Sequence, residues 1–201
     1  MRHGQTDYNK AHLLQGRLDI PLNADGIQQA EKAAERLKEV GIRFDRVICS
    51  PLERAVQTAE IVSGIDRADF TLDDRLIEVA FGPYEGAKVE ELEGDIIKFF
   101  IDPENYQAPE GAESYDDMFK RAGSFLDEMA KADPDESILV LAHGAIIHAM
   151  YYLLKDTELK TLWKLALGNC GYIIVSSDDG RPYIAEEHFI KENVSIPTNF
   201  R

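Results

Sequence analysis

The residues best suited to chemistry lie at the start of the chain, where Arg2, His3 and Gly4 are consecutive. A guanidinium presents a fixed fork of N–H donors that matches a phosphate or a carboxylate, and an imidazole can act as a nucleophile. A glycine lets the backbone approach a ligand closely. The same residues at a chain terminus also fit a solvated, frayed end. Their interpretation therefore depends on residues elsewhere in the sequence.

Two further polar residues follow predicted strands directly. Residues 46–50 form a short apolar run, and Arg54 lies in the first turn of the helix expected after it. Residues 137–142 form a second apolar run, which His143 and Gly144 follow. In a parallel sheet, ligands bind outside the carboxyl ends of the strands, beside helix N-termini that favour anions. We therefore expect Arg54 and His143 to meet at one edge of the sheet.

Apolar side chains at helical spacing predict the helices that would hold these residues. The predicted helices cover residues 25–41, 52–62, 89–99, 115–129 and 145–154. The apolar face expected for the first of them comprises Ile27, Ala30, Ala34 and Leu37. The motif Ser50-Pro51-Leu52-Glu53 fits a capping box with proline at the first helical position, which would start the second helix.

Strand and turn signals complete the pattern. Loops are predicted for residues 7–21 and 73–86, and a short strand for residues 70–72. Two strand-like runs, 172–176 and 183–188, flank Asp179-Gly180 and predict a β-hairpin at one edge of the sheet. Strands that alternate with helices indicate an α/β fold, a three-layer sandwich with a mainly parallel central sheet and helices on both faces.

The length of the chain is compatible with one hydrophobic core. We expect a single domain over residues 1–201, in which residues 78–111 form a cap or insertion over the site.

The chain carries 37 acidic and 22 basic residues, a formal net charge of -15. Such a charge repels nucleic acid and acidic membrane surfaces, so any anionic ligand is expected to be small. No apolar run reaches transmembrane length and the N-terminus lacks the apolar core of a signal peptide, which predicts a soluble, cytoplasmic protein. Cys49 and Cys170 are then expected to be reduced core residues. The oligomeric state does not follow from the sequence.

Taken together, these motifs resemble those of the histidine phosphatase superfamily, which includes the cofactor-dependent phosphoglycerate mutases and their phosphatase relatives. The matching segments are Arg2-His3-Gly4-Gln5-Thr6 with Asn9, Gln15-Gly16 with Asp19, Pro21-Leu22 with Gly26, Ser50-Pro51-Leu52-Glu53-Arg54-Ala55 with Gln57-Thr58-Ala59, Glu78 with Phe81-Gly82 and Glu85-Gly86, and Ala142-His143-Gly144. Each segment is a weak signal by itself, but their joint spacing is specific.

The resemblance implies that His3 is a nucleophile that becomes a phosphohistidine, and that Glu78 is the general acid and base. It implies a phosphate-binding set made of Arg2, Asn9, Arg54, His143 and Gly144. Gln15 either lines the pocket or stabilises the loop. Phosphoryl transfer needs positive groups held around its charged oxygens, which these side chains supply without a metal or another cofactor. The remaining histidines, His12, His148 and His188, lack metal-ligand spacing.

Considered singly, each of these residues has a simpler explanation. Arg54 would more often be a surface cation of a helix, Glu78 a solvated loop carboxylate, and His143 a hydrogen-bonded core histidine. Their co-occurrence favours the catalytic interpretation.

The implied activity is metal-independent hydrolysis of a phosphomonoester on a small phosphorylated metabolite. Glycolytic mutases of this family bind the glycerate carboxylate with an arginine pair in the middle insertion, whereas residues 85–111 contain Lys88 and Lys98 but no arginine. Hydrolysis is therefore favoured. Mutase-type phosphoryl transfer and a catalytically weak phospholigand-binding protein are the alternatives. The aromatic side chains expected to suit an alkyl, aryl or nucleoside leaving group are Phe81, Tyr84, Phe99, Phe100 and Tyr106.

Members of the family carry a short apolar strand directly before Arg-His-Gly, at the centre of the sheet. Here a single residue precedes Arg2. Because the loss of a central strand would leave its neighbours with unpaired backbone groups, we expect native residues upstream of Met1.

Overall fold

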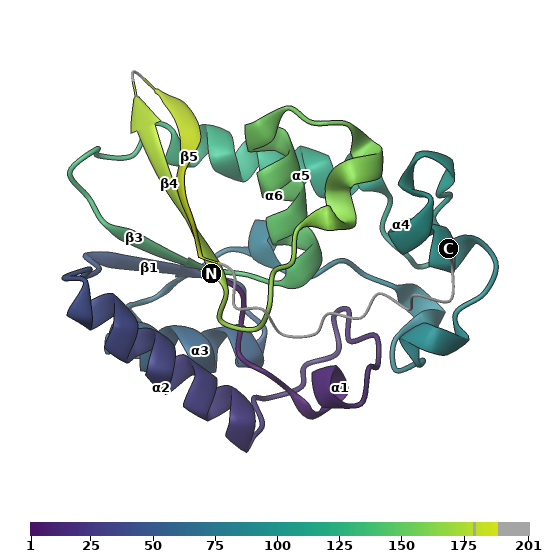
Figure 1. The fold of residues 1–201 in the computed structure, drawn as a ribbon, viewed down its shortest axis with the longest axis horizontal. Helices are drawn as coiled ribbons and strands as arrows, with labels where there is room; N and C mark the ends of the chain where they lie inside the picture. Colours follow the sequence, from purple (N-terminus) through teal and green to yellow (C-terminus); the bar gives the residue numbers. More distant parts are fainter. Residues whose placement is uncertain (179, 189–201) are drawn as a thin grey trace.

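A three-stranded parallel sheet lies at the centre of the computed structural model, which describes residues 1–178 and 180–188. The strands are β1 (Arg46–Cys49), β2 (Thr71–Leu72) and β3 (Ile138–Leu141), in the order β2-β1-β3 (Figure 1). β1 pairs with β3 from Arg46↔Ile138 to Cys49↔Leu141. The predicted α/β fold with a mainly parallel sheet is confirmed.

The opening residues run beside β3. Arg2 forms a parallel bridge with Ala142, and the amide nitrogen of His3 donates to the Ala142 carbonyl at 3.2 Å. On the other side, the amide nitrogen of Arg2 donates to the Gly171 carbonyl at 2.9 Å. Residues 1–3 therefore lie between the carboxyl end of β3 and the residue that precedes the C-terminal hairpin.

Helices cover both faces of the sheet, as predicted (Figure 1). One face carries α2 (Ala24–Glu39) and α3 (Glu53–Ser63), and the other carries α5 (Tyr115–Met129) and α6 (Gly144–Lys155). Two helices are shorter, α1 (Asp7–Lys10) and α4 (Asp95–Ile101). The 3₁₀ segments are Arg67–Asp69, Asp74–Leu76, Gly82–Tyr84, Val89–Glu91, Pro103–Asn105 and Leu159–Lys164.

Apolar side chains fill the space between the layers. On the α2–α3 side, Ala30, Leu37 and Ala59 pack with Val47 of β1. On the α5–α6 side the buried residues include Met118, Phe125 and Ile146. Burying one large aliphatic or aromatic side chain stabilises a fold by about 1.5–3 kcal/mol. The two clusters thus hold the strand ends and the helix N-termini in fixed relation to each other.

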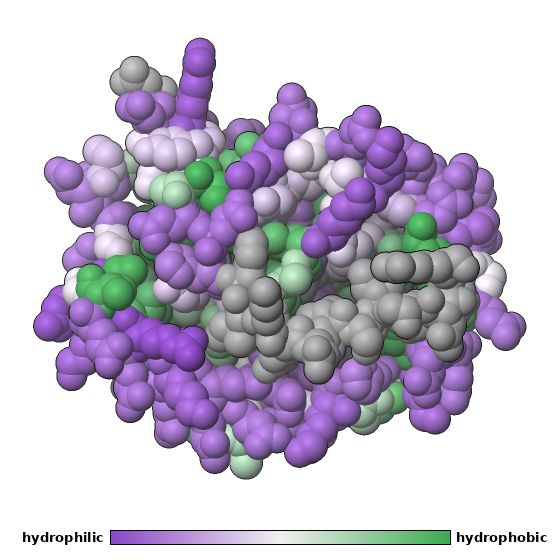
Figure 2. Space-filling model, viewed as in Figure 1, coloured by the Kyte–Doolittle hydropathy of each residue, from purple (hydrophilic) through white to green (hydrophobic). Residues whose placement is uncertain are grey.

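The surface is mainly hydrophilic on the face that Figure 2 shows. Within the described residues, no helix combines the length and the apolar character that a membrane span requires. Cys49 and Cys170 are buried free thiols, as predicted, and burial raises the pKa of Cys49 to about 12.

The predicted loop over residues 7–21 and the predicted capping box at Ser50 are both wrong. Residues 7–21 are not a continuous loop, because α1 follows Thr6, whose hydroxyl accepts from the Asn9 amide at 3.2 Å while the Asn9 side chain accepts from the Thr6 amide at 3.1 Å. Asparagine stands where this capping box usually has Glu or Gln. At Ser50 the expected box does not form, since α3 begins at Glu53 after an extended Leu52 that makes no side-chain cap.

The prediction of one helix over residues 89–99 is also wrong. The 3₁₀ turn ends at Glu91, Gly94 takes a φ of 69°, and α4 begins only at Asp95. This left-handed glycine interrupts the helix. On α2, Ile27 is 40% exposed, and the buried alanine beside Ala30 is Ala33 rather than Ala34.

The C-terminal hairpin is confirmed. Its strands, β4 (Tyr172–Asp178) and β5 (Arg181–His188), pair antiparallel in a two-stranded sheet of their own. The hydrogen bond from Arg2 to the Gly171 carbonyl connects this sheet with the central one. The expected turn residue Asp179 lies outside the described residues.

Candidate active site

His3 is buried, with 2% exposure, at the edge of the sheet where the opening segment leaves β3. Its Nδ1 lies 2.7 Å from the Gly4 carbonyl oxygen. A carbonyl oxygen can only accept, so Nδ1 carries a proton and the neutral ring keeps its lone pair on Nε2. Burial, followed by the charges of Arg54 and Arg2, lowers the pKa of His3 well below 6.5. His3 is therefore held neutral, with its lone pair on Nε2, as the predicted role of a nucleophile requires.

His143 faces His3 from the N-terminus of α6, with ring centroids 5.1 Å apart. Its Nδ1 accepts from Arg54 Nε at 3.2 Å, so its proton lies on Nε2, which donates to Ser50 Oγ at 2.7 Å. Burial, followed by Arg54 and His3, lowers the pKa of His143 well below 6.5. Two neutral imidazoles therefore face each other at this edge of the sheet.

Arg54 is completely buried in the first turn of α3, as the sequence predicts for its position. Nη1 donates to the Leu18 carbonyl at 2.7 Å and Nη2 to the Gly16 carbonyl at 2.8 Å. Each Nη carries a second N–H that can bind an oxyanion. Burial lowers the pKa of Arg54 to about 10, so the guanidinium stays charged at neutral pH. A fixed, desolvated positive charge thus lies beside both histidines.

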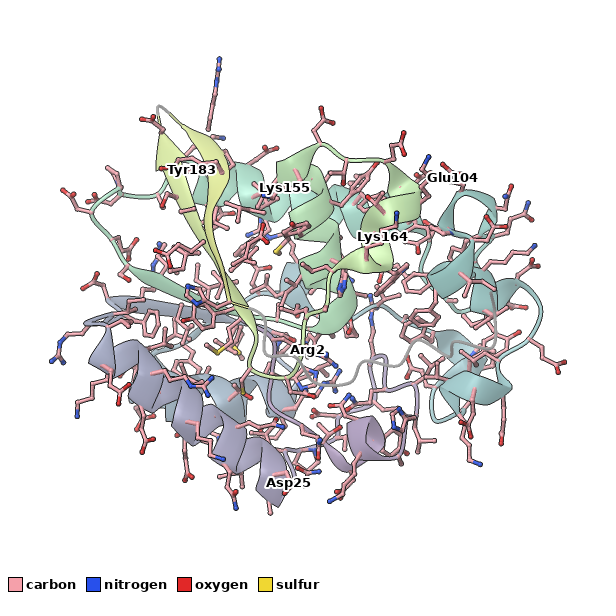
Figure 3. The ribbon with its side chains drawn as sticks, in the orientation of Figure 1. Arg2, Asp25, Glu104, Lys155, Lys164 and Tyr183 are labelled. Carbon is pink, nitrogen blue, oxygen red and sulfur yellow. The ribbon has the colours of Figure 1, made fainter. Side chains whose placement is uncertain are left out.

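Arg2, Glu78 and Gly144 lie together at the N-terminus of α6. A side-chain carbon added to Gly144 would lie 3.7 Å from Glu78 Oε2 and 3.8 Å from Arg2 Nε. Glu78 Oε2 accepts from the Ala145 amide at 3.3 Å, and Arg2 Nη1 donates to the Leu167 carbonyl at 2.7 Å. Figure 3 shows Arg2 near the middle of the molecule, where the opening segment passes the base of the hairpin. The Glu78 carboxylate therefore lies next to the guanidinium that the sequence predicts to bind phosphate.

Asn9 and Gln15 make different hydrogen-bond contacts near the opening segment. Asn9 Oδ1 accepts from the Thr6 amide at 3.1 Å and from Asn169 Nδ2 at 3.3 Å, which leaves its amide nitrogen as the end that can donate to a phosphate. Gln15 is buried, and its Oε1 accepts from Thr6 Oγ1 at 2.8 Å. This contact stabilises the loop after α1. A direct contact of Gln15 with phosphate stays a prediction.

Sequence reasoning missed two residues of this site. Ser50 accepts the Nε2 proton of His143, and its place between a strand and Pro51 could have indicated it. Asn169 is 3% exposed and donates from Nδ2 to the His3 carbonyl at 3.0 Å. It lies outside the recognised motifs, so only the tertiary structure brings it to His3.

The aromatic residues expected around a leaving group are largely packed in the core. Phe81 and Phe99 are 4% and 0% exposed and meet edge to face at a centroid distance of 5.2 Å. Trp163 Nε1 donates to the Phe99 carbonyl at 2.6 Å. Phe81 and Phe99 therefore stabilise the segment around α4 and do not face a leaving group.

An open cleft of about 680 Å³ lies elsewhere on the molecule. Its lining residues are Arg46, Arg75, Lys120, Ser124, Asp127, Glu128, Met129, Lys131 and Ala132. Its two arginines are already paired, Arg46 with Glu136 and Arg75 with Asp73. The buried cluster at His3 is the better candidate for chemistry, because its charges are desolvated and its donors converge. Among the described residues, no three His, Cys, Asp or Glu side chains are grouped to hold a metal ion.

Comparison with known proteins agrees with this geometry. Residues 1–188 match the model of the histidine phosphatase superfamily (branch 1). Phosphoserine phosphatase 1 from Hydrogenobacter thermophilus is 27% identical over 188 residues, which cover 92% of this chain and 88% of that protein. Phosphoglycerate mutase-like protein 4 from Arabidopsis thaliana is 32% identical over 162 residues, which cover 75% of this chain and 67% of that protein.

Solved structures of phosphatases are also similar to this chain. Phosphoserine phosphatase from Entamoeba histolytica in complex with 3-phosphoglyceric acid has a TM-score of 0.82 at 30% identity, and the match covers 94% of this chain and 95% of that chain. A mutant of that phosphatase in complex with phosphoserine has a TM-score of 0.80 at 31% identity, with 93% of each chain covered. The chain therefore belongs to the histidine phosphatase superfamily, an enzyme family of phosphatases and phosphotransferases.

Proposed function

We propose that this chain is a metal-independent phosphomonoesterase that acts through a phosphohistidine at His3. The observation that carries this proposal is the state of His3, whose Nδ1 is committed to the Gly4 carbonyl at 2.7 Å so that Nε2 keeps its lone pair. Burial, followed by the guanidiniums of Arg54 and Arg2, lowers the pKa of this ring, and the two guanidiniums supply the positive charge that a phosphoryl group needs.

Two half-reactions follow from these positions. First, His3 Nε2 bonds to phosphorus while the bond from phosphorus to the leaving oxygen breaks, and Glu78 gives its proton to that oxygen. Arg2 and Arg54 stabilise the charge on the phosphoryl oxygens. His143 joins them when its Nε2 proton turns from Ser50 Oγ to a phosphoryl oxygen. Second, the Glu78 carboxylate takes a proton from water as the water oxygen attacks phosphorus. The phosphorus–nitrogen bond then breaks, which releases phosphate and restores neutral His3.

The cations of the middle insertion support hydrolysis rather than mutase activity. Lys88 is paired with Glu91 at 3.0 Å and Lys98 with Asp95 at 2.7 Å, each within its own turn. Neither lysine is preorganised for a second anionic group of a bisphosphate. A mutase would exchange phosphate between positions of phosphoglycerate when primed by the bisphosphate. Exchange without net release of phosphate would therefore favour the mutase alternative.

Two structures of one relative indicate which class of substrate to test first. The Entamoeba phosphatase was solved with phosphoserine and with 3-phosphoglyceric acid, which are both small phosphorylated carboxylic acids. We infer that this chain acts on a compound of that class, and phosphoserine is the first substrate to test.

We also infer that residues 78–111 cover the site as a cap within a single domain. Leu14 and this segment exchange backbone hydrogen bonds, since the Gly86 amide donates to the Leu14 carbonyl at 2.7 Å and the Leu14 amide donates to the Ala87 carbonyl at 2.9 Å. The same loop supplies Gly16 and Leu18, the carbonyl partners of Arg54. The cap is therefore fastened to the loop that holds the phosphate-binding guanidinium.

The test is turnover of phosphoserine and of 4-nitrophenyl phosphate in excess chelator. His3→Ala should abolish turnover of both and the formation of an acid-labile phosphoenzyme, because it removes the nucleophile. The matched control is His188→Ala, since that exposed imidazole pairs with Glu186 on the hairpin. Full activity of His3→Ala would refute the proposal. Loss of wild-type activity on addition of the chelator would also refute it, because the proposed reaction needs no metal.

A further inference from the structure

The backbone around Glu78 has to be held by other parts of the chain. Residues 77–80 lie outside the helices and strands of the described structure, between the 3₁₀ turns Asp74–Leu76 and Gly82–Tyr84. A general acid needs a fixed position relative to the leaving oxygen. The hydrogen bonds to this segment therefore determine where its carboxyl group lies.

Arg121 of α5 holds the segment from one side. Its Nη1 donates to the carbonyls of Arg75 and Ile77 at 2.7 and 2.5 Å. Its Nε and Nη2 donate to the two carboxylate oxygens of Glu113 at 2.6 and 2.9 Å. The side chains of Arg121 and Glu113 are only 14% and 8% exposed. A bidentate pair of this kind fixes the plane of the guanidinium, so the two carbonyls meet a rigid donor.

Glu113 and Arg17 hold the segment from the other side. The amide of Glu113 donates to the Ala80 carbonyl at 2.8 Å, and Glu113 Oε2 accepts from Arg17 Nη2 at 3.3 Å. Arg17 Nε in turn donates to the carbonyl of Glu78 itself at 3.2 Å. The backbone of Arg17 is also fixed, because its amide donates to Glu85 Oε1 at 2.9 Å. The carbonyls of residues 77, 78 and 80 thus all accept from one network.

We propose that Arg17, Glu113 and Arg121, the Glu78 clamp, are positioning residues for the proton transfer by Glu78. The inference rests on the proposed function, in which Glu78 is the general acid. Arg17 and Arg121 donate to the backbone carbonyls on either side of the Glu78 Cα, while Glu113 connects the two guanidiniums. A loosened clamp would let the proton donor move away from the leaving oxygen.

The test compares two esters of similar shape, phenyl phosphate and 4-nitrophenyl phosphate. Nitrophenolate leaves with little help from an acid, whereas phenolate needs the proton. Arg17→Met and Arg121→Met should lower kcat on phenyl phosphate by about ten-fold or more and kcat on 4-nitrophenyl phosphate by less than about three-fold. Combined with Glu78→Gln, they should cause no further loss on phenyl phosphate, because the acid is already absent. Arg17→Lys should recover part of the loss.

The matched control is Arg46→Met, which breaks the partly exposed ion pair with Glu136 at the start of β1 and should leave both rates unchanged. The Arg17 side chain is 43% exposed, so we expect Arg17→Met to fold. Arg17→Met therefore tests the clamp if Arg121→Met does not fold. Equal losses of kcat on both esters would overturn the clamp and leave the proposed function standing. A further loss of kcat on phenyl phosphate in the Glu78→Gln background would do the same. No hydrolysis by the wild-type chain would instead overturn the proposed function, and the clamp with it.

Discussion

Asn169 connects the polar residues of the opening segment. From its side-chain nitrogen it donates to the His3 carbonyl at 3.0 Å and to Asn9 Oδ1 at 3.3 Å. Asn169→Ala removes both bonds, so His3 and the Asn9 amide that is proposed to bind phosphate lose a shared support. We expect kcat on phosphoserine to fall on the order of ten-fold, since a buried hydrogen bond contributes about 1 kcal/mol and misplacement of a reacting group costs more.

The control for this substitution is Asn105→Ala, because that asparagine pairs with Asp102 on an exposed turn. It should keep the wild-type kcat. If Asn169→Ala turned over phosphoserine at the wild-type rate, the proposed support of His3 and Asn9 would be wrong.

The protonation state of His3 can be measured without a substrate. Burial and the two neighbouring guanidiniums lower its pKa well below 6.5, so the ring should be neutral in the free protein at pH 6.5. NMR titration of the His3 ring carbons should therefore show its midpoint at lower pH than that value. A midpoint at or above pH 6.5 would contradict the electrostatic account of the nucleophile.

At the scale of elements, the opening segment depends on its contact with α2. The sequence suggested that Gly4 serves close approach to a ligand, but a side-chain carbon there would lie 2.6 Å from the Gly26 carbonyl oxygen. A carbon added to Gly26 would lie 2.0 Å from the Gln5 carbonyl oxygen. The first turn of α2 and the backbone after His3 thus pack directly on each other, which only glycine allows.

Gly26→Ala should therefore destabilise the protein by about 1–3 kcal/mol and lower its activity, because the backbone next to His3 has to move. Gly123→Ala on α5 is the matched control, since its added carbon would meet Leu153 Cδ1 at an ordinary 3.8 Å. That change should stabilise the protein by roughly 0.5–1 kcal/mol through helix propensity. Urea unfolding and kcat measure both effects. Wild-type stability of Gly26→Ala would show that the contact can relax without cost.

For the molecule as a whole, the buried histidines make stability depend on pH. The pKa values of His3 and His143 are lowered in the folded state from an ordinary value of 6.5. Below that pH the unfolded chain binds protons that the folded chain does not, so their contribution is complete above pH 6.5 and is lost as the pH falls. Each group should add a slope of up to ~1.4 kcal/mol per pH unit.

Urea unfolding between pH 6.5 and about pH 5 measures this slope. Burial also lowers the pKa of His148, so three buried histidines contribute to this slope. His3→Gln removes one of them and should reduce the slope by up to ~1.4 kcal/mol per pH unit. Stability that is constant over this range, or an unchanged slope in His3→Gln, would contradict the electrostatic account of these histidines.

The sequence by itself determined the family and the parallel α/β core, and it predicted the site residues except Ser50 and Asn169. The apolar runs 46–50 and 137–142 contain the strands Arg46–Cys49 and Ile138–Leu141, because an apolar pattern is a local signal. Arg54 and His143 follow these strands at fixed spacing. The predicted helix over residues 89–99 was wrong because of Gly94, and the predicted loop over residues 7–21 was wrong because Thr6 and Asn9 form a capping box. A sequence pattern cannot rank such small local energies.

Only the tertiary structure decided how the site residues are held. The tautomer of His143 depends on Arg54 and Ser50, and the support of His3 depends on Asn169, which is 166 residues away along the chain. The carbonyl of Glu78 meets Arg17, 61 residues earlier. Hydrogen bonds between such distant residues form only after the layers pack, because neither partner affects the local conformation of the other. The motifs therefore predict the reacting groups, whereas packing fixes their protonation and position.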